Sequence, residues 1–533
     1  MLQLKNRLAK LKHVRIGINL KKRKPVFIPP VPPLSIPRGF TIIERQSLYE
    51  PFAHAVIVQN PTTGEYKYIL DELLLDTFER EIYNKILEVL LAEIHSPREE
   101  IKSAREFFDK QAKKIVDKYR ISLGWLPDVS WSKILYHAER DLVGFGPIDA
   151  LMRDSNIEDI SCDGVGKPVY VWHRKYENLE TNMVFKADES VDNLIVKLVH
   201  MSGKHVSTAF PIVDASLPGK HRLAVCYRRE LTPFGTTFTI RKFREDPYSI
   251  IDLINLGTLS EEVAAYFWTC LENRSSIMIL GGTGSGKTTA LNALACLIRP
   301  GSKILTIEET AELNLSHENW VSLISRQSYG LGENRTGEVS LFDLVKASMR
   351  HRPDYLVVGE IRGSEAYVLF QALATGHGGM CTMHAENVDT AVKRLTQKPM
   401  DIAPAYIPLM NLISVVHRVH LAKAGEFKAY RRLTSVDEIV DYEDYRNVFT
   451  WKPTKDIFDS SIEKSALLPA ISKHSGLSKE ELIEEIKRRK NVLSWMRKHN
   501  IRSYRDVAEI ITEYYSRPKE FYTKKVEKLV SAT

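Results

Sequence analysis

A glycine-rich segment near the middle of the chain has the residue types and spacing of a phosphate-binding loop. The segment consists of Gly281, Gly282, Thr283, Gly284, Ser285, Gly286, Lys287 and Thr288, followed by Thr289. It matches G-x-x-x-x-G-K-[ST], in which the glycines let backbone N–H groups turn toward phosphate oxygens. The lysine of this motif reaches the β- and γ-phosphates, and the hydroxyl of the Ser or Thr that follows it ligates Mg²⁺. The sequence therefore predicts a nucleotide site at residues 281–289.

The residues on either side of this loop strengthen the prediction. Residues 276–280 form an apolar run typical of a buried strand, and residues 289–298 have a helical pattern that Pro300 and Gly301 close. A strand, a glycine loop and a helix are what the motif requires, because the helix N-terminus then faces the anion. The alternative is a plain glycine turn, which this context disfavours.

Glu360 is the candidate for the residue that orients and deprotonates an attacking water. It follows the apolar run Tyr355–Val358 in the sequence Gly359-Glu360-Ile361-Arg362. The end of a strand beside a phosphate loop is where such a carboxylate is placed. An Asp usually ends this strand, whereas Gly359 takes that position here. The alternative for Glu360 is a solvated loop glutamate.

Two further segments end in polar residues that could serve the same site. Ile304–Ile307 is a strand-like run followed by Glu308 and Glu309. If this strand neighbours the phosphate-loop strand, one of the two carboxylates can hold the water shell of Mg²⁺ or assist the base. His384 follows another short strand and could hydrogen-bond to the γ-phosphate, although a histidine in such a position is more often structural.

The pattern of the whole chain indicates an α/β protein. Residues 251–430 alternate strand and helix patterns, which favours βαβ units and a mainly parallel sheet. We expect five segments: a basic tail and proline-rich linker (1–40), a mainly helical N-terminal domain (41–130), a small α/β domain (131–250), an ATPase domain (251–430) and a helical C-terminal region (431–533). A hinge is expected at about 245–255.

The motifs, in this order and spacing, resemble those of the secretion-system ATPase superfamily, which serves type II and type IV secretion, pili and archaella. The matching segments are residues 281–288, 306–312, 355–362 and 375–384. The resemblance extends to Tyr136, Arg140-Asp141, Gly144–Pro147, Ile157–Ser161 and Phe238–Arg241, which look like the archaeal branch. The five scattered cysteines form no tetracysteine metal insertion, which also favours that branch.

The resemblance implies a fold, an assembly and further site residues. It implies a RecA-like P-loop domain preceded by a smaller, PAS-like α/β domain, in a homohexameric ring that uses ATP and Mg²⁺. Arg222 and Arg241 occupy the two strand positions from which the preceding domain would stabilise charge on the γ-phosphoryl group. Their alternative is an ordinary surface arginine on an edge strand. Further candidates are Arg326, Arg350, Arg352 and Arg362, and sequence does not say which arginine crosses a subunit boundary.

One departure from the family pattern affects the metal. The segment that usually reads I-E-D reads Ile307-Glu308-Glu309 here. The resemblance therefore transfers Glu308 as a catalytic carboxylate more safely than it transfers Glu309 as a metal ligand, because glutamate reaches one methylene further than aspartate.

The distribution of charge argues against a nucleic-acid protein. The chain of 533 residues has a net charge of +8, but residues 1–40 contain ten Lys and Arg and no acid. Removing those ten charges from +8 leaves the rest of the chain at −2. A nucleic-acid groove should be basic within a folded domain. The tail is better suited to an anionic membrane surface or an acidic partner.

We therefore expect a cytoplasmic motor, peripheral at the cytoplasmic membrane. It would hydrolyse ATP to power the assembly of a pilus-like filament, or secretion, through a polytopic membrane platform protein. No apolar run approaches the length needed to span a bilayer, and the first residues do not read as a secretory signal. The alternatives are a RecA-type nucleic-acid translocase, a conjugative DNA-transfer ATPase and a nucleotide-gated scaffold without catalysis.

Overall fold

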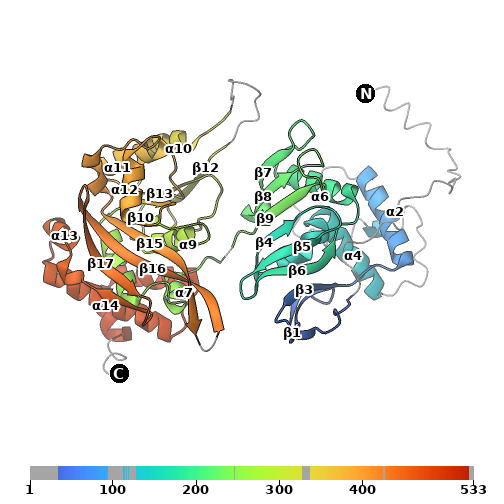
Figure 1. Ribbon diagram of the computed structural model, residues 1–533, viewed down its shortest axis with the longest axis horizontal. Helices are drawn as coiled ribbons and strands as arrows, with labels where there is room; N and C mark the ends of the chain where they lie inside the picture. Colours follow the sequence, from blue (N-terminus) through green and yellow to red (C-terminus); the bar gives the residue numbers. More distant parts are fainter. Residues whose placement is uncertain are drawn as a thin grey trace. The chain divides into compact units, whose positions relative to one another are not determined.

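The chain forms two compact units that divide between Lys242 and Phe243 (Figure 1). The computed structural model describes residues 34–93, 112–114, 116, 118, 128–244, 246–326, 337–423 and 426–526. Within these residues, each unit is built on a sheet of nine strands. The same residues contain no helix with the length and apolar character of a membrane span. The basic tail and most of the proline-rich linker lie outside the described residues.

The first unit combines antiparallel strands with a few helices. Its strands are β1 (Thr41–Tyr49), β2 (Ala53–Gln59), β3 (Tyr66–Glu72), β4 (Ile157–Cys162), β5 (Pro168–His173), β6 (Glu177–Val184), β7 (Ile212–Ser216), β8 (Arg222–Cys226) and β9 (Thr237–Arg241). Its described helices are α2 (Thr77–Glu93), α4 (Asp128–Leu142), α5 (Asp149–Arg153) and α6 (Asp188–Met201), with short 3₁₀ turns at Gly146–Ile148 and Pro218–Lys220.

The sheet of this unit continues across the boundary that the sequence placed at residue 130. Its order is β1-β2-β3-β6-β5-β4-β9-β8-β7. The N-terminal hairpins join the rest through a short parallel pairing of β3 with β6, in which Lys67 lies opposite Glu180 and Tyr68 opposite Thr181. The sequence pattern of residues 52–58 and 66–70 predicts two short strands, and these are β2 and β3. They belong to this sheet and not to a separate, mainly helical domain. Local patterning misses that connection, because a pairing between residues more than 100 positions apart leaves no trace in a short window.

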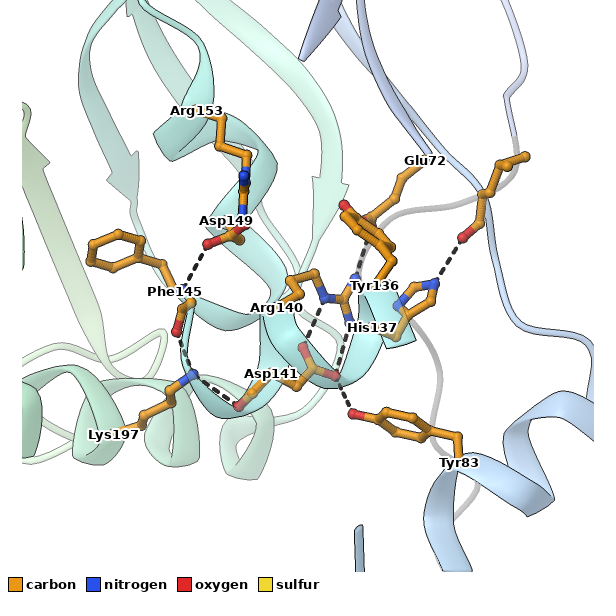
Figure 2. A network of polar contacts seen from close by, with 12 residues as sticks. Glu72, Tyr83, Tyr136, His137, Arg140, Asp141, Phe145, Asp149, Arg153 and Lys197 are labelled. Atoms are coloured by element: carbon orange, nitrogen blue, oxygen red, sulfur yellow. Dashed lines mark hydrogen bonds and ion pairs between the residues drawn. The ribbon is translucent and has the colours of Figure 1, made fainter. Parts of the chain in front are cut away.

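A buried polar network joins the helices of the first unit to the end of β3 (Figure 2). The carboxylate of Glu72 accepts hydrogen bonds from the hydroxyl of Tyr136 at 2.6 Å and from Arg140 at 2.9 Å. Arg140 also donates to Asp141 at 2.8 Å, and Asp141 accepts from the hydroxyl of Tyr83 on α2 at 2.6 Å. Tyr136, Arg140 and Asp141, which carried part of the family resemblance, thus have a structural role here.

The same network holds the turn after α4. Lys197 of α6 donates to the carbonyls of Asp141 at 2.9 Å and Gly144 at 2.5 Å (Figure 2). On the other side, Nε2 of His137 lies 2.8 Å from the carbonyl oxygen of Leu73. Burial, followed by the charge of Arg140, lowers the pKa of His137 to about 4, so the imidazole is neutral at pH 7.

The second unit alternates strands and helices through most of its length. Its strands are β10 (Ile277–Leu280), β11 (Ile304–Glu308), β12 (Trp320–Ile324), β13 (Tyr355–Val358), β14 (Gly378–Met383), β15 (Leu412–Lys423), β16 (Glu426–Asp441), β17 (Asp444–Lys452) and β18 (Ile457–Ser460). Its described helices are α7 (Ile250–Asn255), α8 (Glu261–Glu272), α9 (Lys287–Ala295), α10 (Leu341–Ser348), α11 (Glu365–Ala374), α12 (Val388–Thr396), α13 (Leu467–Ser475), α14 (Lys479–Lys498), α15 (Tyr504–Ser516) and α16 (Pro518–Phe521).

The sheet of the second unit is parallel where the candidate site residues lie. Its order is β12-β11-β13-β14-β10-β15-β16-β17-β18, with parallel pairing from β12 to β15 and antiparallel pairing beyond. Four of the parallel strands, β10, β11, β13 and β14, are buried on both faces. Ile277 and Ile279 of β10 face the core that contains α8 and α9, whereas Met278 and Leu280 face the core that contains α10, α11 and α12. The predicted mainly parallel sheet is thus present.

The C-terminal residues are part of this second unit. β16 passes through residue 430, where the sequence placed a boundary, and β17 and β18 follow it before the predicted helices begin. Leu482, Val492 and Ile511 of α14 and α15 share one core with α8 and α9. Helix α7, inside the expected hinge, starts with a capping box between Ser249 and Asp252 and belongs to the same core.

Removing the guanidinium of Arg140 should strongly destabilise the first unit. In Arg140→Ala, Glu72 and Asp141 would lose their buried cation, so we expect the free energy of unfolding to fall by about 3–5 kcal/mol. The matched control is Arg45→Ala, because Arg45 pairs with Asp71 at 2.9 Å on the surface and is 54% exposed. Its loss should be about 1 kcal/mol or less. Urea unfolding of the full chain measures both, and equal losses would contradict the assignment.

The neutral state of His137 should make folding depend on pH. Below its ordinary pKa of 6.5, the unfolded chain binds a proton that the folded protein binds only near pH 4. The free energy of unfolding should therefore fall by about 2–3 kcal/mol between pH 7 and pH 4.5 through this residue. The measurement is the difference in this pH dependence between the wild-type chain and His137→Gln. Parallel curves for the two proteins would show that His137 does not contribute.

Candidate active site

The glycine-rich loop connects β10 to α9, as the sequence predicted. Gly286 is the N-cap residue of α9 and has a left-handed backbone with φ of 95°, and Gly284 has φ of 70°. A Cβ atom on Gly281 would collide with the carbonyl oxygen of Val416 on β15 and would lie 2.5 Å from Oγ of Ser285. The loop therefore packs directly against β15, which only glycine at this position allows.

Lys287 lies at the start of α9 and is buried. Its Nζ donates a hydrogen bond to the carbonyl of Gly282 at 2.9 Å, across the loop. It also lies 3.3 Å and 3.4 Å from the two ring nitrogens of His384. Burial lowers the pKa of Lys287 from its ordinary value, while the nearby carboxylate of Glu360 opposes this shift. The ammonium group is thus held inside the loop, where phosphate oxygens would lie.

Glu360 lies just beyond the end of β13 and faces three basic groups. Arg362 donates two hydrogen bonds to its carboxylate, at 2.9 Å and 2.7 Å, and Nε2 of His384 lies 3.3 Å from Oε1. Burial alone would raise the pKa of Glu360, but Arg362, His384 and Lys287 together lower it below its ordinary value. The carboxylate is therefore ionised at neutral pH and able to accept a proton or a hydrogen bond from water.

His384 follows β14 and lies between Lys287 and Glu360. Its carbonyl oxygen accepts a hydrogen bond from Arg394 of α12, which fixes the backbone at this point. Burial and then the charge of Lys287 lower the pKa of His384 below 6.5, so the ring is neutral at pH 7. A neutral imidazole can donate a hydrogen bond from one nitrogen and accept one at the other.

Glu308 reaches the site indirectly. The strand that carries it, β11, is not beside β10, because β13 and β14 lie between them. The side chain of Glu308 is buried, and its Oε1 accepts hydrogen bonds from the backbone of Glu312 at 2.9 Å and of Leu313 at 3.0 Å. A Cβ on Gly359 would lie 3.1 Å from Cγ of Glu308. This explains why Gly359 stands where a strand of this kind usually ends in Asp.

Glu309 and Thr288 are the predicted metal ligands. The side chain of Glu309 is 50% exposed, and its carboxylate lies 3.8 Å from a nitrogen of Arg362. Thr288 lies in the first turn of α9, beside Lys287. The described residues contain no group of three or more His, Cys, Asp or Glu side chains that could hold a metal by themselves. One hydroxyl and one carboxylate suit Mg²⁺, which is commonly held by few protein ligands together with substrate phosphates.

Arg222 and Arg241 lie in the first unit, on the neighbouring strands β8 and β9. They are directly opposite each other in the antiparallel register. Arg222 pairs with Asp214 at 2.6 Å, and Arg241 pairs with Asp159 at 3.3 Å. The two arginines are thus neighbours on the same sheet. Their role toward a nucleotide stays a prediction.

Sequence reasoning missed one residue at the loop. Nε of Arg431, on β16, donates to the carbonyl of Gly284 at 3.3 Å, although the two residues are 147 positions apart. No motif marks Arg431, and the only signal is its place on a strand that returns along β15.

A family model and a relative that spans nearly the whole chain agree with the motifs. A family model described as "Type II/IV secretion system protein" matches residues 141–433. An uncharacterized protein of Methanocaldococcus jannaschii is 34% identical over 553 residues, which covers 97% of this chain and 98% of that protein. A putative conjugal transfer protein of Mycobacterium tuberculosis is 31% identical over 309 residues, covering 56% of this chain and 85% of that protein. The solved structure of the pilus retraction motor PilT with bound ADP covers 52% of this chain and 78% of its own, with 19% identity and a TM-score of 0.38.

The close approach of the loop to β15 gives a test within the motif itself. In Gly281→Ala, the added methyl group must displace backbone, so the free energy of unfolding should fall by about 1–3 kcal/mol. The matched control is Gly282→Ala, because a Cβ on Gly282 meets no atom within 4 Å. Its unfolding free energy should stay within about 0.5 kcal/mol of wild type. Urea unfolding without nucleotide measures both, and a stable Gly281→Ala would show that the loop does not need this approach.

Proposed function

We propose that this chain, which belongs to the type II/IV secretion system protein family, is an ATPase motor that drives a secretion or pilus-type machine. One observation carries the proposal. Lys287, Glu360 and His384 come from three different segments, after β10, β13 and β14, and His384 lies 3.3 Å from both Lys287 and Glu360 at the edge where the strands end. This is the arrangement of a phosphate-binding cation, a carboxylate base and a neutral hydrogen-bonding group.

The chemistry follows from these positions. The loop 281–289 and Lys287 would bind the phosphates of ATP, and Glu360 would orient the attacking water and accept its proton. His384 would hydrogen-bond to the γ-phosphate or the water. The hydroxyl of Thr288 and the carboxylate of Glu309 would hold Mg²⁺, which neutralises phosphate charge. In the structure, Arg362 holds Glu360 in a two-point ion pair, so water activation requires this pair to loosen.

Arg222 and Arg241 complete the proposed site. Two arginines side by side on β8 and β9 would place positive charge against the γ-phosphoryl group as it transfers. Each is now paired with an aspartate, Asp214 or Asp159, so binding the nucleotide would require exchange of these partners. Glu308 stays the proposed second catalytic carboxylate. Its hydrogen bonds to the backbone of Glu312 and Leu313 hold the segment that follows β11.

The larger assembly is proposed from the family. We propose a homohexamer in the cytoplasm that works on a polytopic membrane platform protein, with the basic tail of residues 1–40 contacting the membrane surface or that partner. The cargo could be protein subunits of a filament or a secreted substrate. The mycobacterial relative named a conjugal transfer protein favours a second candidate, transfer of DNA, for which turnover should rise when nucleic acid is added.

ATP turnover tests the proposal. Lys287→Ala should remove the phosphate-binding cation, and Glu360→Gln should remove the base, so each should lower kcat by roughly 10²–10⁴-fold. The folded structure should survive Glu360→Gln, because glutamine keeps the shape of the side chain. The measurement is phosphate release by the full chain with Mg²⁺ and ATP.

An exposed ion pair on α14 provides matched controls. Lys487 and Glu484 pair at 2.8 Å, with side chains 64% and 60% exposed. Lys487→Ala and Glu484→Gln should therefore leave turnover unchanged. ATP binding without phosphate release by the wild-type chain would favour the nucleotide-gated scaffold over the motor. Full turnover in Glu360→Gln would show that Glu360 is not the base.

A further inference from the structure

Two arginines lie side by side on the ribbon that borders the phosphate loop. β15 pairs with β10 up to Val415, then continues past the end of β10, and β16 returns beside it (Figure 1). Arg418 of β15 lies directly opposite Arg431 of β16 in this antiparallel register. Partners in such a register project from the same face of the ribbon, and like charges placed this way destabilise a sheet.

Arg431 contacts the phosphate loop at Gly284 and Gly286. Its Cδ lies 3.0 Å from the position that a Cβ on Gly286 would take, so its aliphatic stem packs against the start of α9. Its Nε donates to the carbonyl of Gly284 at 3.3 Å. The side chain is exposed, and among the described residues Arg431 forms no ion pair with a carboxylate. The remaining guanidinium donors are therefore available beside the loop.

The next residue fixes which way Arg431 points. Arg432 is only 1% exposed and donates to both carboxylate oxygens of Asp456, at 2.7 Å and 2.9 Å, and to the carbonyl of Leu256 at 3.0 Å. Successive side chains on a strand point to opposite faces. Because Arg432 is anchored in the interior, Arg431 is held on the face of β16 that meets the loop.

We propose that Arg431 binds the phosphate chain of the nucleotide held by the same subunit's loop. This inference rests on the proposed function, since it requires a nucleotide at residues 281–289. A guanidinium forms short, charge-assisted hydrogen bonds with phosphate oxygens and can bind two of them at once. Arg431 thus contributes a further cation to the site. It comes from β16 and lies outside the loop motif that contains Lys287. The ligand class is a nucleoside di- or triphosphate, recognised through its phosphates and not through its base.

Competition binding with the full chain tests the inference. A fluorescent ADP analogue is displaced by ADP, by GDP and by inorganic tripolyphosphate. In Arg431→Ala, the affinity for all three competitors should fall by about tenfold, because each loses the same charge-assisted hydrogen bonds. Arg431→Lys should lose less, because it keeps the charge without the planar fork. The control Arg517→Ala removes an arginine that is 74% exposed at the end of α15 and should bind like wild type.

The outcomes separate this inference from the proposed function. A loss confined to ADP, with tripolyphosphate unaffected, would mean a contact with the base and would overturn the proposal. Wild-type affinities in both Arg431 variants, with binding lost in Lys287→Ala, would overturn it and leave the proposed function standing. A wild-type chain that binds no ligand in this assay would overturn both. The urea midpoint of each variant confirms that it is folded before binding is measured.

Discussion

The candidate site depends on one constraint, which is that four parallel strands of the second unit end at the same edge while both of their faces are buried. β10, β13, β14 and β11 are too apolar to lie anywhere but between two helical layers, so their ends are the only places where polar side chains can follow them. Lys287, Glu360, His384 and Glu308 all follow or end these strands. The packing of the sheet therefore brings these four side chains to one edge, and electrostatic attraction between them is not needed to explain it.

Burial and neighbouring charges then determine the protonation state of these groups. The site combines Lys287, Arg362 and Arg431 with the carboxylates of Glu360 and Glu309, and the neutral ring of His384 lies among them. The cations lower the pKa of Glu360 against the effect of burial, whereas burial and then the neighbouring lysine lower the pKa of His384, so the carboxylate is charged and the imidazole is not. An arriving polyphosphate would bring several negative charges into this balance. Its natural partners are the cations, and their release from Glu360 would free the carboxylate for water.

The sequence predicted the parts of the fold that are local. The strand, loop and helix around residues 281–289 and the strand ends at Val358 and Met383 were correct, because apolar runs and glycine spacing act over a few residues. The parts that depend on distant pairing were not predicted. The contact of β3 with β6, the passage of β16 through residue 430 and the position of Arg431 each join residues far apart in the chain. Glu308 was predicted in part. The sequence marked it as a site carboxylate, but it could not predict that the side chain accepts hydrogen bonds from the backbone of residues 312 and 313.

The continuity of the second sheet past residue 430 bears on how the protein can be divided. A fragment that ends at the expected domain boundary would keep β15 but lose most of β16, together with the helices that cover α8 and α9. It would present an unpaired strand edge and a bare apolar surface, both of which promote aggregation. The smallest soluble piece that contains the phosphate loop should instead begin near Phe243 and retain the chain through Val526.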